Sequence, residues 1–170
     1  FEEHRNATEL YEDCKAARKA RITAVSRRTE EVRAPALYDL TGLQTDANLY
    51  HGLTAIQVQE ITQSLYEKKL ISYPRTACRF LPEDVYATLP AVMERMLACK
   101  EFRTYADRLD IAGAKAVINP LKTTEHHAII ITGMPPGDLA REEMQVYTLI
   151  VGRMLEAFSP SCKVKAPSNA

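Results

Sequence analysis

A tyrosine and two arginines stand close together in the stretch ISYPRTACRF, residues 71–80. A phenol has a pKa of about 10, so Tyr73 is a weak nucleophile at neutral pH unless cations surround it. Arg75 lies two residues further on, and residues i and i+2 of an extended backbone project from the same face. Pro74 favours an extended backbone between them. We therefore expect the phenolic oxygen and the guanidinium to stand side by side.

This pairing suits attack on a phosphodiester. The tyrosine would be the nucleophile, and the arginine would neutralise charge on the non-bridging oxygens, whose geometry the guanidinium matches. Lys68, Lys69 and Arg79 would extend the basic patch along a nucleic acid backbone. A tyrosine and an arginine near the end of a strand are common, so the spacing alone also fits residues without a catalytic role.

A pair of histidines opens the β-branched stretch HHAIIIT, residues 126–132, for which we predict a strand. The two imidazoles of a strand point to opposite faces, so at most one of His126 and His127 shares a site with Tyr73. That histidine would hydrogen-bond a phosphate oxygen or assist proton transfer. The alternative is that one ring packs in the core and the other is solvated.

Two helices are predicted within residues 39–70. Asp39 or Thr41 can cap the first, and Thr54 with Gln57 can form a capping box for the second. A glycine turn separates the helices, and the short run LISY that follows them is predicted to be a strand. This order is that of a helix-turn-helix with a possible wing.

The remaining pattern is also mainly helical. Apolar residues recur at helical spacing from residue 147 to residue 158, which predicts a buried helix face. Pro90 cannot lie deep in a helix, so we expect two short helices that divide near it. The other predicted elements are a helix over residues 6–20, a strand over 21–33 and a strand over 162–166. The fold class is therefore mainly α with short strands (α+β).

Composition sets the broad class of the chain. Its 170 residues are 46% hydrophobic and 26% charged, as in an ordinary globular protein. Lys+Arg and Asp+Glu number 22 each, so a nucleic acid site must be a local basic patch. No apolar run has the length of a membrane span or the core of a signal peptide. The four cysteines lack metal-ligand spacing, and we expect free thiols in a reducing cytoplasm. Because Phe1 is not a start methionine, we expect a longer parent protein.

Four segments, taken in order, resemble the type IA DNA topoisomerases, with the topoisomerase III branch closest: APALYDLTGLQTDAN, GLTAIQVQEITQSLYEKKLISYPRTACRFLP, EHHAIIITG and VYTLIVGRMLEAFSP. The resemblance covers about residues 5–164. It implies that Tyr73 attacks single-stranded DNA, forms a 5′-phosphotyrosine and leaves a free 3′-hydroxyl. The protein then opens as a gate, passes another strand and reseals the break. Arg75 would help to place the scissile phosphate, and His126 would contact the same region.

The resemblance also implies a domain arrangement. Residues 34–160 would form the catalytic-tyrosine domain, with a winged-helix, CAP-like helix-turn-helix. Residues 1–33 and 161–170 would be stubs of a neighbouring β-rich arch domain. The family's toprim domain, which binds Mg²⁺, is absent from this sequence, so we expect no cofactor here and no cleavage by the isolated chain. The expected partners are single-stranded DNA and the toprim and arch domains, in the cytoplasm at the bacterial nucleoid and not at a membrane.

Two departures from the family pattern leave alternatives open. Ala77 stands where the family usually has aspartate, which puts the support of Arg75 in doubt and allows a gate whose tyrosine is no longer used. Ile131 replaces a proline of the HHAIIPT pattern, which we expect to be mild. A second alternative is a winged-helix DNA-binding module without catalysis. Against it, the second helix offers Gln59 and Gln63 but no arginine to read bases.

Overall fold

The computed structural model describes residues 4–17, 19, 26–99, 102–103, 117–119 and 125–168. The chain divides into two compact units, one formed by Phe1–Glu31 with Lys163–Ala170 and the other by Val32–Cys162. The assignment of these segments to an arch domain and a catalytic-tyrosine domain stays a prediction.

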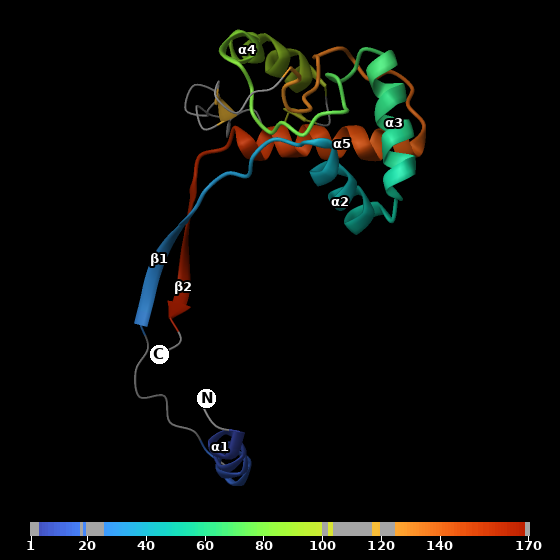
Figure 1. Cartoon of the computed structure of the whole chain (residues 1–170). Helices are drawn as coiled ribbons and strands as arrows, with labels where there is room; N and C mark the ends of the chain where they lie inside the picture. The colour runs from blue at the N-terminus through green and yellow to red at the C-terminus, as the bar shows by residue number, and fades with distance from the viewer. Residues whose placement is uncertain are drawn as a thin grey trace. The chain divides into compact units, whose positions relative to one another are not determined.

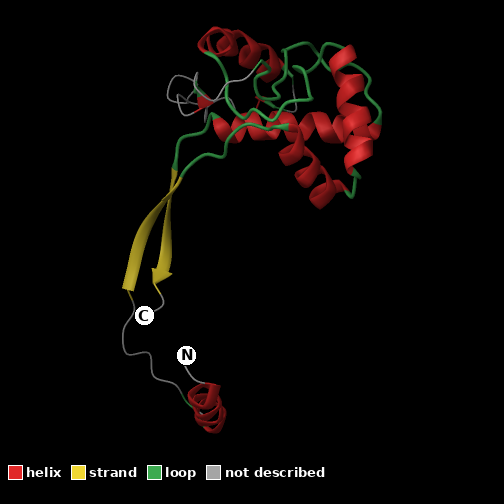
Figure 2. Ribbon diagram, viewed as in Figure 1, coloured by secondary structure: helices red, strands yellow, loops and turns green. Residues whose placement is uncertain are grey.

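The first unit contains a helix and most of a small sheet. Helix α1 spans His4–Ala16, within three residues of the predicted bounds at its N-terminal end. Strand β1, Ser26–Val32, pairs with β2, Cys162–Ser168. The two strands run in opposite directions (Figure 2). The strands predicted near the two ends of the chain are therefore confirmed, although residues 21–25 lie outside the described part.

The described part of the second unit forms four helices (Figure 1): α2 is Leu40–His51, α3 is Ala55–Glu67, α4 is Glu83–Ala98 and α5 is Arg141–Ala157. Helices α2, α3 and α5 pack pairwise against one another. The face predicted for the last helix is confirmed, because all its periodic residues are buried: Tyr147, Ile150, Val151, Met154, Leu155 and Phe158. Burial raises the pKa of the Tyr147 phenol to about 12. The fold is thus mixed, mainly helical with a short antiparallel sheet.

Local hydrogen bonds fix the ends of α2 and α3. The Asp39 carboxylate accepts the Gly42 N–H at 2.7 Å, so Asp39 rather than Thr41 caps α2. Gly52 closes this helix in the left-handed region, at φ 69°. At the start of α3, Thr54 N–H donates to Gln57 at 2.8 Å and Thr54 Oγ1 accepts from the Gln57 N–H. The predicted order of helix, glycine turn and helix is confirmed.

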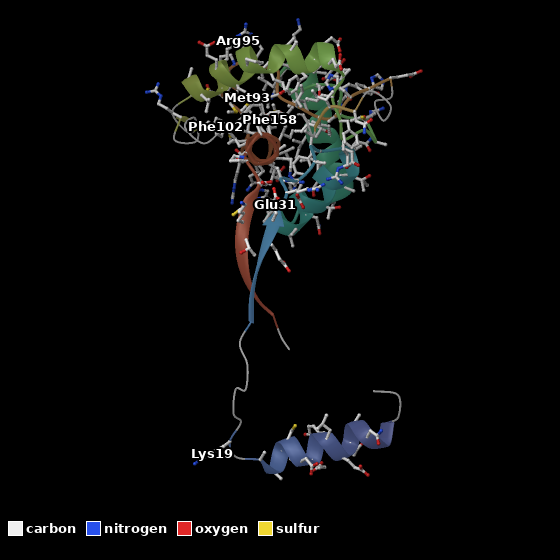
Figure 3. The ribbon with its side chains drawn as sticks, turned by 90° about the vertical axis from the view of Figure 1, so that its left-hand side faces the viewer. Lys19, Glu31, Met93, Arg95, Phe102 and Phe158 are labelled. Carbon is white, nitrogen blue, oxygen red and sulfur yellow. The ribbon has the colours of Figure 1, made fainter. Side chains whose placement is uncertain are left out.

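Helix α4 corrects one prediction. It continues through Pro90 as a single helix, where we expected two. Leu89 and Met93 are buried while Pro90 is exposed. The apolar face therefore keeps the helix intact at the cost of one backbone hydrogen bond. Figure 3 shows Met93 on the side of α4 towards Phe158, with Arg95 on the other side of the helix.

The strands predicted for LISY and HHAIIIT are also wrong. Between the two runs the structure forms an isolated antiparallel bridge, Ile71 with Ile131, and a second bridge joins Tyr38 to Ile129. A regular ladder does not form because the Ile130 N–H donates to a side chain, the Ser72 hydroxyl, at 3.0 Å. Within the described part of the chain, no helix is long and apolar enough to cross a bilayer.

Candidate functional site

The loop that carries Tyr73 joins α3 to α4 and begins with an abrupt turn. After α3 ends, the Lys69 N–H donates to Tyr66 O at 2.8 Å and the Leu70 N–H donates to Leu65 O at 3.0 Å. Lys69 adopts φ 61°, the left-handed conformation that glycine usually supplies at this place. The turn sends the chain away from the helix axis and towards residues 126–132.

Hydrogen bonds connect this loop to the segment that contains the histidines. The Ser72 N–H donates to Ile130 O at 2.8 Å, and the Ser72 hydroxyl donates to Ala128 O at 3.1 Å. Further along, the Thr76 hydroxyl donates to His126 O at 3.1 Å. These bonds hold both sides of Tyr73 against one segment, so the position of its backbone is well determined.

The Tyr73 ring lies between two other rings. Its centroid is 4.3 Å from that of His126, with the planes tilted by 42°, and 5.5 Å from that of Tyr66 in an edge-to-face arrangement. Tyr73 is half-buried, while His126 is exposed. Ring contacts on two sides restrict the ring's rotation and leave the phenol at the edge of the unit, where a ligand can reach it.

Arg75 differs from the sequence-based expectation. The chain bends at Pro74, and the Thr76 N–H donates to Pro74 O at 3.0 Å, so the backbone is turned here rather than extended. The exposed Arg75 side chain faces the outer surface of α3, where it lines a hollow with Gln63 and Glu67 among others. Within the described residues, no hydrogen bond or ion pair engages its guanidinium. It therefore remains available to an anion.

The two histidines diverge, although not as members of a strand. His126 lies against Tyr73, whereas His127 lines a different hollow beside α4. The His127 Nδ1 lies 2.7 Å from Ala128 O, so Nδ1 carries the proton in that contact. The expectation that only one of them shares a site with the tyrosine therefore matches the geometry.

The three other basic candidates have different surroundings. Lys68 forms an ion pair with Glu143 of α5 at 2.6 Å, and Glu143 also accepts from Ser64 at 2.7 Å. These hydrogen bonds, that from Lys68 first, hold the pKa of Glu143 below its usual range. Arg79 is exposed, and its Nε donates to Leu37 O at 3.2 Å. Lys69 alone projects into solvent with no partner among the described residues.

Sequence reasoning did not identify Ser72, Thr76 or Tyr66 as parts of the site. The hydroxyls of Ser72 and Thr76 reach residues 56 and 50 positions away, and no local pattern reveals such contacts. Tyr66 precedes Tyr73 by seven residues at the end of an amphipathic helix, which gives a weak signal. Ala77 is exposed, and the turn around it is closed by the Cys78 N–H donating to Thr76 Oγ1 at 3.0 Å.

Metal-binding groups are not assembled in the described part of the chain. No cluster of three or more His, Cys, Asp or Glu side chains there could hold an ion. The four cysteines, Cys14, Cys78, Cys99 and Cys162, are free in the structure. The residues of this chain that the structure describes therefore do not fit a Mg²⁺ site.

Comparison with known proteins decides the family. A family model described as DNA topoisomerase matches residues 1–168. The chain belongs to this DNA topoisomerase family. It is 36% identical over 150 residues to the DNA topoisomerase 3 of Bacillus subtilis, covering 85% of this chain and 20% of that protein. It is 38% identical over 145 residues to the DNA topoisomerase 3 of Bacillus licheniformis, covering 82% of this chain and 20% of that protein.

A solved topoisomerase shares the fold. The full-length topoisomerase I from Thermotoga maritima superimposes with a TM-score of 0.62 at 16% identity, over 92% of this chain and 26% of that protein. The resemblance to type IA topoisomerases, and to the topoisomerase III branch, is thus confirmed. This member of the topoisomerase family spans about a fifth of the length of its curated relatives.

Proposed function

We propose that this chain is the part of a type IA DNA topoisomerase that carries the nucleophile, Tyr73. The observation that carries the proposal is the position of this phenol. It is half-buried between the rings of Tyr66 and His126, on a loop tied to a second segment by hydrogen bonds. Such a loop can present one oxygen repeatedly in the same place, which breaking and rejoining a strand requires.

In the proposed reaction, the Tyr73 oxygen attacks the phosphorus of a single-stranded DNA phosphodiester. The bond from phosphorus to the 3′-oxygen of the preceding nucleotide breaks, and a 5′-phosphotyrosine forms. The phenol gives its proton to a base, and the 3′-oxygen takes one up to become a hydroxyl. Rejoining reverses these steps: the 3′-hydroxyl attacks the phosphotyrosine and releases the phenol.

The neighbouring basic residues have distinct parts in the proposal. Arg75 is exposed and has no partner among the described residues, so its side chain would turn from the hollow on α3 towards Tyr73 and neutralise charge on the non-bridging oxygens. His126, in ring contact with the nucleophile, hydrogen-bonds the phosphate or takes part in proton transfer. Lys69 and Arg79 contact the DNA backbone near the cut. Lys68 reaches DNA only if its ion pair with Glu143 exchanges for a phosphate.

The rest of the reaction needs residues from outside this chain. The resemblance to type IA enzymes assigns Mg²⁺ to a toprim domain, where it would supply positive charge at the phosphate. We propose that residues 34–160 act as the catalytic-tyrosine domain beside that domain and an arch domain in the bacterial cytoplasm. The order of α2, the Gly52 turn and α3 supports the helix-turn-helix part of this arrangement.

The test uses the full-length protein with labelled single-stranded DNA and Mg²⁺, stopped with denaturant. The wild type should give a covalent protein–DNA adduct, and Tyr73→Phe should give none. Tyr50→Phe is the matched control, because Tyr50 is an exposed tyrosine on α2 that lines a different hollow. An adduct that survives in Tyr73→Phe refutes the assignment. Absence of an adduct from the wild type would favour a DNA-binding module without catalysis.

The 170-residue chain alone provides a second test. Incubated with supercoiled plasmid and Mg²⁺, it should leave the plasmid supercoiled. Relaxed product would show that the chemistry needs no further domain.

A further inference from the structure

Two hollows beside the Tyr73 loop share two lining residues and so lie next to each other. The first, of about 470 Å³, lies between the end of α3 and the loop and is lined by Tyr66 and Lys69 among others. The second, of about 530 Å³, lies against α4 and is lined by Arg95 and His127 among others. Ser72 and Thr132 line both, so we call the whole the Ser72–Thr132 groove. Each part is large enough for a group the size of a nucleobase.

The floor of this groove is built from satisfied hydroxyls. Ser72 Oγ donates to Ala128 O at 3.1 Å and accepts from the Ile130 N–H at 3.0 Å. Thr132 Oγ1 donates to Lys69 O at 2.6 Å. These contacts use the donors of both hydroxyls and make the floor firm. A ligand in the groove must therefore be recognised by the side chains along its walls.

The charged walls favour an anion. The exposed side chains of Lys69 and Arg95 form no ion pair with any described residue. Among the described residues that line the groove, Glu67 is the single carboxylate. It accepts a hydrogen bond from the Gln63 side chain at 2.9 Å. The groove thus carries more positive than negative charge, in a protein whose formal net charge is zero. Phosphates are the anions that such spaced cations suit.

The backbone conformation of Lys69 is a second, independent indication that the groove binds an anion. It occupies a left-handed turn position at φ 61°, where glycine would be unstrained. A lysine there costs stability, and its side chain forms no hydrogen bond or ion pair within the described part of the chain. A positive charge at this point of the groove explains why the strained residue is useful.

Tyr66 connects the groove to the nucleophile. One edge of its ring meets Tyr73, with the centroids 5.5 Å apart, and its side chain also lines the first hollow. With 39% of its surface exposed, the ring has room for a further planar group. Unpaired bases stack on such rings whatever their sequence.

We propose that the Ser72–Thr132 groove holds the single-stranded DNA next to the scissile phosphate, with one base stacked on Tyr66 and backbone phosphates at Lys69 and Arg95. This inference rests on the proposed function, since it needs Tyr73 to act on DNA. It adds two contacts, Tyr66 and Arg95, and a path for the strand from the nucleophile towards α4.

The first experiment measures binding of the full-length protein to single-stranded oligonucleotides at several salt concentrations. Lys69→Gly and Arg95→Gln should each lower the slope of log affinity against log salt by about 0.7, the value for one lost phosphate contact with a single strand. Arg33→Gln, an exposed arginine outside the groove, should leave the slope unchanged. Lys69→Gly should also raise the denaturation midpoint, because glycine relieves the strained turn. Unchanged slopes in both groove variants would overturn the proposal.

The second experiment scans an abasic site along the oligonucleotide. In the wild type, one position near the cut should weaken binding roughly 10-fold, the loss expected for one stacked base. Tyr66→Leu should bind about 10-fold more weakly and lose that sensitivity, whereas Tyr66→Phe should retain both. If the abasic effect is the same in Tyr66→Leu as in the wild type, no base stacks on Tyr66.

The two proposals can fail separately. An adduct that persists in Tyr73→Phe removes the proposed function whatever the groove variants do. If Tyr73→Phe loses the adduct while the groove variants bind and respond to abasic sites like the wild type, the groove proposal alone is wrong.

Discussion

Replacing Asp46 should destabilise the second unit more than any change at the neighbouring surface. The Asp46 carboxylate accepts from the Tyr38 hydroxyl at 2.6 Å and from Arg153 Nη2 at 2.7 Å. The Arg153 guanidinium also lies 4.3 Å from the centre of the Tyr38 ring. Burial, followed by the hydrogen bond to Asp46, raises the pKa of the Tyr38 phenol, which therefore stays protonated and donates. The three side chains act as one network.

The expected magnitude follows from these contacts. Hydrogen bonds to a charged group contribute about 1.5–3 kcal/mol each. The side chains of Asp46 and Arg153 are 20% and 17% exposed, so water compensates part of the loss. Asp46→Ala removes two such bonds and leaves a cation without its partner, and we expect a loss of about 2–3 kcal/mol. For a unit of this size that corresponds to a fall of roughly 10 °C in Tm.

The control is the other acidic partner of the same arginine. Glu156 Oε2 lies 3.2 Å from Arg153 Nε, but the Nε–H forms no hydrogen bond there within the described structure, and the Glu156 side chain is 60% exposed. Glu156→Ala should therefore cost less than about 0.5 kcal/mol. Urea denaturation of the 170-residue chain followed by circular dichroism measures both. A double-mutant cycle with Arg153→Met should give a coupling of about 1 kcal/mol or more.

The result that would refute this reasoning is equality of the two variants. If Asp46→Ala costs no more than Glu156→Ala, the network contributes nothing beyond surface charge. A coupling near zero with Arg153→Met would lead to the same conclusion, even if the single variant is unstable.

Three further perturbations test the packing around the site. Gly133→Ala should cost about 1–2 kcal/mol in urea denaturation, because φ is 82° and a Cβ would lie 3.3 Å from the Val92 backbone; no loss would contradict that close approach. Pro90→Ala should stabilise the chain by about 1 kcal/mol or more, since it restores a hydrogen bond inside an exposed part of α4; a lower Tm would argue against a continuous helix. Because the pKa of Glu143 is lowered in the folded state, its contribution to folding stability is complete above the ordinary value of 4.5 and is lost as pH falls through the lower folded value. Lys68→Met should therefore flatten the acid side of the curve of stability against pH. An unchanged slope would contradict the ion pair.

Local rules predicted the helices that position the site. The cap at Asp39 and the capping box at Thr54 are contacts between residues three apart, so their signals lie within one turn. The buried face of α5 could be predicted because its apolar residues recur at the spacing of one helix face, which must be buried. Pro90 shows the limit of such rules, because burial of Leu89 and Met93 outweighs the local preference of proline to break a helix.

The shape of the tyrosine loop could not be predicted in this way. Tyr73 and Arg75 are only two residues apart, yet the turn at Pro74 directs them to different surroundings. That turn is set by Thr76, whose hydroxyl reaches His126 O across 50 positions of sequence. Similarly, two adjacent lysines read alike in the sequence, and only the tertiary structure shows that Lys68 pairs with Glu143.

The same long-range contacts bear on how this loop would serve the proposed reaction, which must be reversed. The Leu40 N–H donates to Thr76 O at 3.0 Å, and Arg79 Nε donates to Leu37 O at 3.2 Å. Residues 37–40 therefore hold the far end of the tyrosine loop, while residues 126–132 hold it on both sides of Tyr73. A phenol that cleaves a strand, moves with an opening gate and then rejoins the strand must return to one phosphate. Because the loop is fixed to its unit from both sides, the proposed gate motion must carry Tyr73 with the unit as a whole.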